Sequence, residues 1–358
     1  MVQIIATFNI PFVQILNEKG KLVNELPDFA RDHNLLIELY RVMVCTRAFD
    51  KKAIALQRTG RIGTYAPLHG QEAISTAIGN SMRPEDLLVP YYRDYAAQLQ
   101  RGVKMSEILA YWGGDERGSD FACQSEDLPI SVPIATQCLH AVGVAFACKY
   151  RQQKRVVVAC IGDGGTSEGD FYEALNAAGA WHLPIVFVIN NNQWAISMPR
   201  SQQTAAQTLA QKAVAAGFDG VQVDGNDILA CRLEVAKAIE RARNECTPTL
   251  IEAITYRLCN HTTADDASRY QSTLEVTGAQ LKEPIIRFKS YLEQEGIWDE
   301  AQEKALLDEA NILAQSAADE FLNTPPQSIS SAFDYHYQDL PNYLIEQRAL
   351  AMEEVSHA

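Results

Sequence analysis

The sequence predicts an α/β protein with a parallel sheet flanked by helices, preceded by an extended N-terminal arm and followed by a helical C-terminal region. Residues 155–161 and 185–189 are short, continuous apolar runs rich in β-branched residues, and a helical pattern at 170–182 separates them. A strand, helix, strand order joins parallel neighbours in one sheet. Of the 358 residues, 47% are hydrophobic and 21% are charged, which provides apolar side chains for a large core.

The chain divides into three predicted regions: an arm at 1–33, an α/β domain at 34–280, and a helical region with a tail at 281–358. Pro11 and Pro27 interrupt the arm, so we expect it to be irregular and extended. Such an arm should lie over a partner or over its own domain.

Two helices should open the α/β domain. Apolar residues recur at helical spacing over 34–60, where Gly60 ends the pattern, and a second helix is expected over 71–82. Residues 134–150 predict a helix rich in small residues. We expect its apolar face to be buried in this chain's own core, with a subunit contact as the alternative.

The centre of the chain continues the alternation of helices and strands. The helix at 170–182 has one apolar face, and its Trp181 is expected to pack in the core. A further helix is expected at 227–246 and a further strand at 249–256.

The C-terminal region is predicted to be entirely helical. Helical patterns continue after Pro284 to about residue 322, where Pro325 and Pro326 break them. The polar tail that follows should end in a short helix.

Composition excludes several classes of function. Lys and Arg number 31 against 45 Asp and Glu, a net charge of −14 with no segregated basic patch, which disfavours nucleic acid as a partner. No apolar run approaches the ~20 residues that cross a bilayer, and the N-terminus lacks a signal-peptide pattern. The eight cysteines never form a CxxC or CxH pattern, so we expect reduced thiols in a cytoplasmic protein.

The first central strand leads into a glycine-rich loop at 162–170, and ligands of open α/β sheets bind outside the carboxyl ends of strands. Glycines let the backbone approach an anionic ligand closely. The loop also carries Asp163, Glu168 and Asp170, which would repel a bare phosphate. A cation is therefore expected between loop and phosphate, and Mg²⁺ fits this need.

The next strand ends in the run Asn190, Asn191, Asn192, Gln193 and Trp194. Because adjacent parallel strands end at the same edge, these asparagines can face the glycine loop. A Gly-Asp-Gly sequence alone is a common turn, but the asparagine run one crossover later makes it a strong indication of a site.

Gly162-Asp163-Gly164 followed by Asn191-Asn192 resembles the thiamine pyrophosphate signature. The wider segments 162–176, 189–199 and 256–270 resemble the α subunits of 2-oxo acid dehydrogenases, the decarboxylating components of the pyruvate and branched-chain complexes. The resemblance covers about residues 35–325. It implies the diphosphate-binding half of a thiamine diphosphate-binding fold.

The resemblance also implies roles for individual residues. Asp163, the side chain of Asn192 and the main-chain carbonyl of Trp194 would ligate Mg²⁺, although the family often has tyrosine in place of this tryptophan. Tyr92 and Arg93 would contact the diphosphate. The glycine loop would also bind the cofactor through Gly162, Gly164 and Gly165.

Two further segments match the family. His261 would lie over the cofactor, stabilise the substrate-derived intermediate and take part in acyl transfer to lipoamide; Asn260 stands where the family usually has glycine or histidine. Main-chain groups of Val132 and Ile134 would hold the aminopyrimidine ring. Residues 131–137 resemble a potassium-binding run of branched-chain relatives, with simple helix capping as the alternative.

The chain shows motifs for only half of a thiamine site, because the glutamate that activates the cofactor belongs to a second domain in this family. The resemblance therefore implies a β subunit in an α2β2 heterotetramer, and a lipoyl domain of the acyltransferase component as a further partner.

The sequence indicates the substrate less clearly than it indicates the cofactor. We choose pyruvate because Tyr65, Leu68 and Tyr91 are expected to narrow the pocket, whereas 131–137 and 192–194 look closer to enzymes for branched-chain 2-oxo acids such as 3-methyl-2-oxobutanoate. Acetoin is a third candidate substrate.

Two rival functions differ in class. A dinucleotide-binding oxidoreductase needs G-x-G-x-x-G, but Ser167 stands at the position of the third glycine. A catalytically silent interface subunit is the other rival, and the presence of Asp163, Asn192, Arg93 and His261 argues against it.

Overall fold

The computed structural model describes residues 2–123 and 126–356. Its main sheet has six parallel strands in the order β1-β7-β8-β4-β3-β2. The strands are β1 (Phe12–Val13), β2 (Leu87–Val89), β3 (Val157–Gly162), β4 (Ile185–Asn191), β7 (Asp219–Asp224) and β8 (Thr249–Ile254). A separate two-stranded hairpin joins β5 (Trp194–Ala195) to β6 (Met198–Pro199). The prediction of an α/β protein with a parallel sheet is confirmed.

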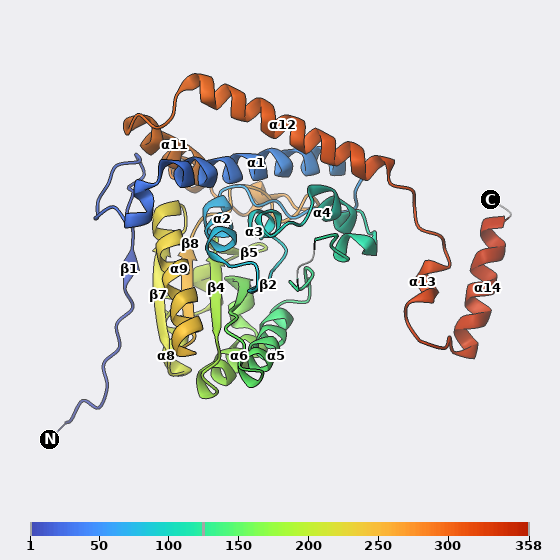
Figure 1. The fold of residues 1–358 in the computed structure, drawn as a ribbon, viewed down its shortest axis with the longest axis horizontal. Helices are drawn as coiled ribbons and strands as arrows, with labels where there is room; N and C mark the ends of the chain where they lie inside the picture. The colour runs from blue at the N-terminus through green and yellow to red at the C-terminus, as the bar shows by residue number, and fades with distance from the viewer. Residues whose placement is uncertain (1, 124–125, 357–358) are drawn as a thin grey trace.

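Both faces of the sheet are buried, which explains the continuous apolar runs of β3 and β4. Along β3, Val158 and Cys160 pack into one hydrophobic cluster, whereas Val157 and Ala159 pack into another. The first cluster lies beneath α1 (His33–Arg58), α2 (Glu72–Ser81) and α9 (Ile228–Glu245). The second lies beneath α5 (Thr136–Tyr150) and α6 (Gly169–Ala180). Figure 1 shows this arrangement of helices around the sheet.

The arm joins the core of its own domain. β1 pairs with the outer edge of β7, and Ile15 and Leu16 are buried. The Asp227 carboxylate accepts hydrogen bonds from the amides of Ile15 and Leu16, at 2.6 and 2.7 Å, and it also caps the first turn of α9. Residues before β1 run away from the body (Figure 1).

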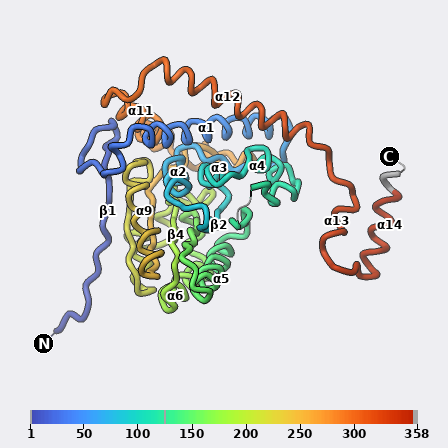
Figure 2. Tube along the Cα trace, viewed as in Figure 1, coloured from blue at the N-terminus to red at the C-terminus, as the bar shows by residue number. Residues whose placement is uncertain are grey.

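The remaining helices are mostly short. They are α3 (Tyr95–Gln100), α4 (Met105–Trp112), α7 (Arg200–Gln203), α8 (Lys212–Ala215), α10 (Thr273–Gln280), α11 (Pro284–Gln294), α12 (Glu300–Asn323), α13 (Ser331–Asp334) and α14 (Asn342–Ser356). The long α12 lies alongside α1, while α13 and α14 stand apart from the body (Figures 1 and 2). At 15 residues, α14 is longer than the short helix that the sequence predicted.

Of the two expectations about helix faces, the one for Trp181 is wrong and the one for α5 is confirmed. Trp181 is 51% exposed, because α6 ends at Ala180 and the indole packs edge-on against Phe146 instead of entering the core. The small-residue face of α5 is buried in this chain's own core, as expected, but the opposite face exposes Phe146 and Tyr150. In the described part of the chain, no helix is long and apolar enough to span a membrane.

Candidate active site

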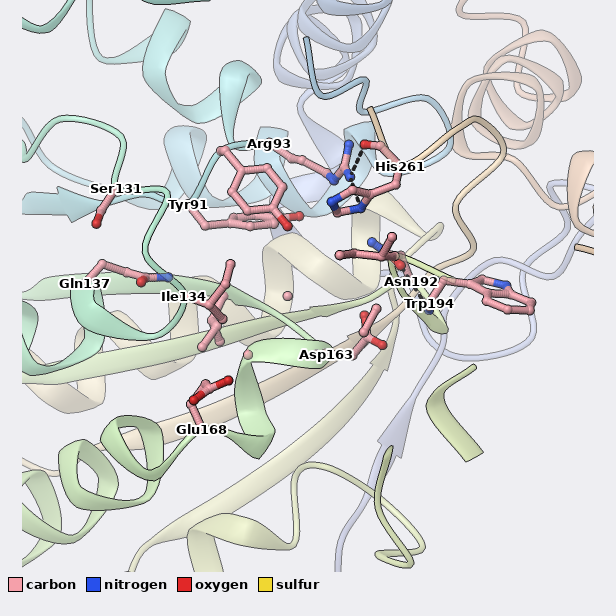
Figure 3. Close-up of a pocket in the computed structure, with 17 residues that line it drawn as sticks. Tyr91, Arg93, Ser131, Ile134, Gln137, Asp163, Glu168, Asn192, Trp194 and His261 are labelled. Atoms are coloured by element: carbon pink, nitrogen blue, oxygen red, sulfur yellow. Dashed lines mark hydrogen bonds between the residues drawn. The ribbon is translucent and has the colours of Figure 1, made fainter. Parts of the chain in front are cut away.

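A cavity of about 230 Å³ lies at the carboxyl ends of β3 and β4, where the sequence predicted a site (Figure 3). It is lined by all of the predicted site residues except Val132: Tyr92, Arg93, Ile134, Gly162, Asp163, Gly164, Gly165, Asn192, Trp194 and His261. Segments from the first, middle and last thirds of the chain therefore meet at this edge of the sheet.

The glycine loop brings the backbone close to the cavity. A Cβ atom at Gly164 would lie 2.6 Å from the Cβ of Ala195, which leaves no room for a side chain there. A Cβ atom at Gly165 would lie 2.7 Å from Ile161 Cδ1, so a side chain there would require Ile161 to move. Asp163 lies at the start of this loop with only 2% of its surface exposed. Burial raises the pKa of Asp163 to about 6, although Gln203 Nε2 donates a hydrogen bond to its Oδ2 at 3.2 Å.

The first two asparagines of the run are held by the segment that follows β2 and by the neighbouring strand β8. Asn190 Nδ2 donates to the Tyr91 hydroxyl at 3.0 Å, and Asn191 Nδ2 donates to Glu252 Oε1 on β8 at 2.7 Å. These contacts join the ends of β4 and β8 to the segment after β2. The end of β4 is therefore fixed from both sides.

Asn192 is 4% exposed, and its amide is bonded at both ends. Its Nδ2 donates to Gln71 Oε1 at 3.0 Å, and its Oδ1 accepts from the Trp194 amide at 3.2 Å. The Trp194 indole packs against Tyr270, with ring centroids 5.4 Å apart, and points away from Asp163 in Figure 3.

Arg93 is the most unusual charge at the site. It is 2% exposed, yet no acidic side chain in the described residues pairs with it. Its guanidinium donates to the carbonyls of Pro67 and His261, the latter at 2.7 Å, and lies 3.2 Å from His261 Nδ1. A buried cation that bonds only to neutral acceptors is costly unless an anion joins it. The site therefore suits an anionic ligand.

A second buried cation was missed in the sequence. Arg257 is 0% exposed and donates to the carbonyls of Cys259 and Ile196 and to the Tyr270 hydroxyl, while its Nη1 has no partner among the described residues. Burial lowers the pKa of its guanidinium. Nothing in the local sequence distinguishes it from an ordinary arginine after a strand.

His261 is held as a neutral ring. Burial, together with the nearby Arg93 and Arg257, lowers the pKa of His261 to about 3. A guanidinium can only donate, so the contact from Arg93 assigns an unprotonated Nδ1 and places the proton on Nε2. The ring can therefore donate a hydrogen bond from Nε2.

The opposite end of the cavity is open. Val132 and Ile134 are 50% and 46% exposed, whereas Gln137 is buried and donates to the Cys160 carbonyl at 3.0 Å. Among the described residues, no group of three His, Cys, Asp or Glu side chains could hold a metal. The predicted Mg²⁺ ligands are of another kind, one carboxylate with an amide and a main-chain carbonyl.

Comparison with known proteins agrees with this geometry. The model of a family described as "Dehydrogenase E1 component" matches residues 40–330, most of the chain. The chain belongs to the dehydrogenase E1 component family. The resemblance to α subunits of thiamine pyrophosphate-dependent 2-oxo acid dehydrogenases is thereby confirmed.

Named relatives of this E1 chain share nearly its full length. A protein of Staphylococcus aureus strain Mu50 named "Pyruvate dehydrogenase E1 component subunit alpha" is 42% identical over 347 residues, which cover 96% of this chain and 93% of the relative. A protein of the same name from Staphylococcus epidermidis strain ATCC 12228 is 41% identical with the same coverage.

The E1 site differs from the sequence prediction in its narrowing residues. Tyr91 lines the cavity, but Tyr65 and Leu68 do not. Both instead face Asp50, whose Oδ1 accepts from the Tyr65 hydroxyl at 2.9 Å and from the Leu68 amide at 3.0 Å. Tyr65 therefore supports the site from outside the cavity, because its main chain also bonds to Thr263 in the His261 loop.

Proposed function

We propose that this chain is the α subunit of a pyruvate dehydrogenase, which with a β subunit carries out oxidative decarboxylation of pyruvate and acyl transfer to lipoamide. The names of the relatives and their near-complete coverage support this substrate. The observation that carries the proposal is the buried Arg93, which lacks an acidic partner and lines one cavity with Asp163 and Asn192.

Mg²⁺ would be held by Asp163, the Asn192 side chain and the Trp194 carbonyl. This donor set fits the ion, which is usually bound by one or two carboxylates together with phosphate oxygens of the ligand. Tyr92, Arg93 and the glycines of the loop would bind the diphosphate. When bound, thiamine pyrophosphate supplies the electron sink that stabilises the carbanion left by loss of CO₂.

His261 would act as a hydrogen-bond donor over the reacting atoms. Its low pKa keeps the ring neutral at physiological pH, and the contact with Arg93 leaves the proton on Nε2. A neutral donor can stabilise oxygen charge in the substrate-derived intermediate without giving up its proton. The same group would then assist transfer of the acyl group to lipoamide.

A β subunit would complete the open end of the cavity. The volume of about 230 Å³ is below the ~300–1,000 Å³ of typical ligand pockets, and the lining residue Ile134 is half exposed. Val132, between the lining residues Ser131 and Ile134, is half exposed as well. Main-chain groups of Val132 and Ile134 would hold the aminopyrimidine ring once covered. The family resemblance implies that the two subunits form an α2β2 heterotetramer, served by the lipoyl domain of an acyltransferase.

Two minor proposals accompany the main one. Potassium would bind at residues 131–137, close to the aminopyrimidine position. A cytoplasmic location is supported by the buried free thiols of Cys45, Cys138, Cys160 and Cys231, which suit a reducing compartment.

A substrate panel with the reconstituted αβ pair tests the proposal. We expect higher kcat/KM for pyruvate than for 3-methyl-2-oxobutanoate or acetoin, each measured with an artificial electron acceptor. If kcat/KM were higher for the branched-chain acid or for acetoin, that compound would be assigned as the substrate in place of pyruvate. Absence of turnover with all three, in a pair that also fails to bind thiamine pyrophosphate, would favour a silent interface subunit.

A further inference from the structure

Gln71 is a buried residue whose side chain contacts Asn192, one of the proposed Mg²⁺ ligands. It lies immediately before α2, is only 1% exposed, and is separated from Asn192 by 121 positions in the sequence. Its Oε1 accepts the hydrogen bond from Asn192 Nδ2 at 3.0 Å. This contact links the first third of the chain to the asparagine run.

The Asn192 amide is held by two contacts, one at each end. The Trp194 main-chain amide can only donate, and it faces Asn192 Oδ1 at 3.2 Å, which leaves Nδ2 for Gln71. Rotating the Asn192 amide by half a turn would place Nδ2 against the Trp194 N–H and Oδ1 against Gln71 Oε1. The contact with Trp194 would then be repulsive, and the contact with Gln71 would be repulsive unless the Gln71 amide turned as well.

Gln71 is itself held in place by its surroundings. Its main-chain amide donates to the Leu68 carbonyl at 2.9 Å, and the following Glu72 accepts from the Gly70 amide at 3.1 Å and pairs with Arg47. The turn that carries the Gln71 side chain is therefore anchored at several points. An acceptor on a fixed turn can hold the amide of Asn192 more firmly than a mobile side chain could.

The other end of the Gln71 amide makes no such contact. Gln71 Nε2 is buried and has no hydrogen-bond partner among the described residues. A buried donor without a partner is destabilising, so stability alone does not account for glutamine at this position. In the described part of the chain, the one hydrogen bond that this side chain makes is with Asn192.

We propose that Gln71 is a positioning residue for Mg²⁺, holding Asn192 so that Oδ1 and not Nδ2 is offered to the ion. The inference rests on the proposed function, in which Asn192 is a ligand. Mg²⁺ accepts oxygen ligands in a strict octahedral geometry, so an amide that presents nitrogen does not bind it. Partners that orient metal ligands typically contribute ~10–100-fold to metal affinity.

Two substitutions of Gln71 separate its acceptor from its volume. Gln71→Met keeps the approximate size and removes the acceptor, whereas Gln71→Glu keeps an acceptor oxygen. Gln98→Met is the matched control, because Gln98 is also buried, at 2% exposure, and neither of its amide atoms has a partner among the described residues.

The measurement is Mg²⁺ affinity of each αβ complex in the presence of thiamine pyrophosphate, by calorimetry, with Mn²⁺ binding followed by electron paramagnetic resonance. We expect Gln71→Met to weaken Mg²⁺ binding by ~10–100-fold. Gln71→Glu and Gln98→Met should stay within about threefold of wild type. Saturating Mg²⁺ should restore cofactor affinity to Gln71→Met, which a general structural defect would not allow.

The possible outcomes separate the positioning role of Gln71 from the proposed Mg²⁺ site on which that role depends. If wild-type cofactor binding is unaffected by EDTA, the Mg²⁺ site itself fails and the inference fails with it. If the wild type requires Mg²⁺ but Gln71→Met binds the ion normally, or Gln71→Glu loses as much affinity as Gln71→Met, only the positioning role is overturned.

Discussion

The two ends of the cavity are built in opposite ways. At one end Arg93, Asp163 and Asn192 are almost fully buried, and each is bonded to side chains or carbonyls of distant segments. At the other end the lining residue Ile134 is half exposed, as is Val132, which lies two residues before it and does not itself line the cavity. The chain thus completes the end proposed for the diphosphate and leaves open the end proposed for the aminopyrimidine. The proposed β subunit would cover this open end.

The buried end is rigid because several strands and loops converge on it. The segment 65–71 contributes carbonyls to Arg93 and to the His261 loop, and Gln71 to the asparagine run. The open end is formed by a single segment of the chain, which leads into α5. Ala135, the residue before this helix, has a left-handed backbone conformation (φ 68°).

Removing Asp163 should affect the buried end most. We expect Asp163→Ala to weaken Mg²⁺-dependent cofactor binding by more than ~100-fold, because the diphosphate would lose its bridging cation and face Glu168 directly. Calorimetry on the αβ complex measures this, with the exposed Glu173→Ala on α6 as control. Wild-type affinity in Asp163→Ala would remove Asp163 from the metal site.

Removing His261 should separate catalysis from binding. We expect His261→Ala to lower lipoyl-domain acylation by roughly 100-fold while cofactor affinity changes by less than about threefold, because the ring acts on reacting atoms and not on the diphosphate. The assay compares cofactor affinity, decarboxylation with an artificial acceptor, and acylation. The exposed His33→Ala serves as control, and a His261 variant normal in both reactions would make this ring a bystander.

A pH effect should reveal the support beneath the buried end. Burial raises the pKa of Asp50 from 3.8 to about 7. Between these values the folded protein keeps a proton that the unfolded chain has lost, so the stability that this group contributes falls as pH rises from about 4 to 7 and is constant above.

Asp50→Asn keeps an acceptor for Tyr65 and Leu68 but removes this titration. The melting temperature of the variant relative to wild type should therefore rise by roughly 2–4 °C between pH 4.5 and 7.5. The exposed Asp308→Asn should show no such trend. A constant difference for Asp50→Asn across this range would contradict the assigned titration.

Local patterns in the sequence predicted the centre of the fold and the motifs of the site. β3 and β4 were visible because burial on both faces demands unbroken apolar runs. β7 was not, because its sequence begins and ends with aspartate and contains Gln222, and β1 has only two residues. Trp181 was misplaced because α6 ends at Ala180, two residues before the predicted end at 182.

The supporting residues of the site could not be read from the sequence. Gln71 and Arg257 act through contacts with segments far away in the chain, and neither belongs to a local pattern that signals its partner. The positions of Asp163 and Asn192 were predictable. Each follows a strand that is visible in the sequence, and neighbouring parallel strands end at the same edge of the sheet.

The most direct test of the split site compares the purified α chain with the αβ complex. The α chain alone should bind thiamine pyrophosphate weakly and decarboxylate no 2-oxo acid, because its open end lacks the second half of the site. Addition of the β subunit should restore tight binding and turnover, in an α2β2 particle by analytical ultracentrifugation. Robust turnover by the α chain alone, with no second polypeptide detectable by mass spectrometry, would contradict the account.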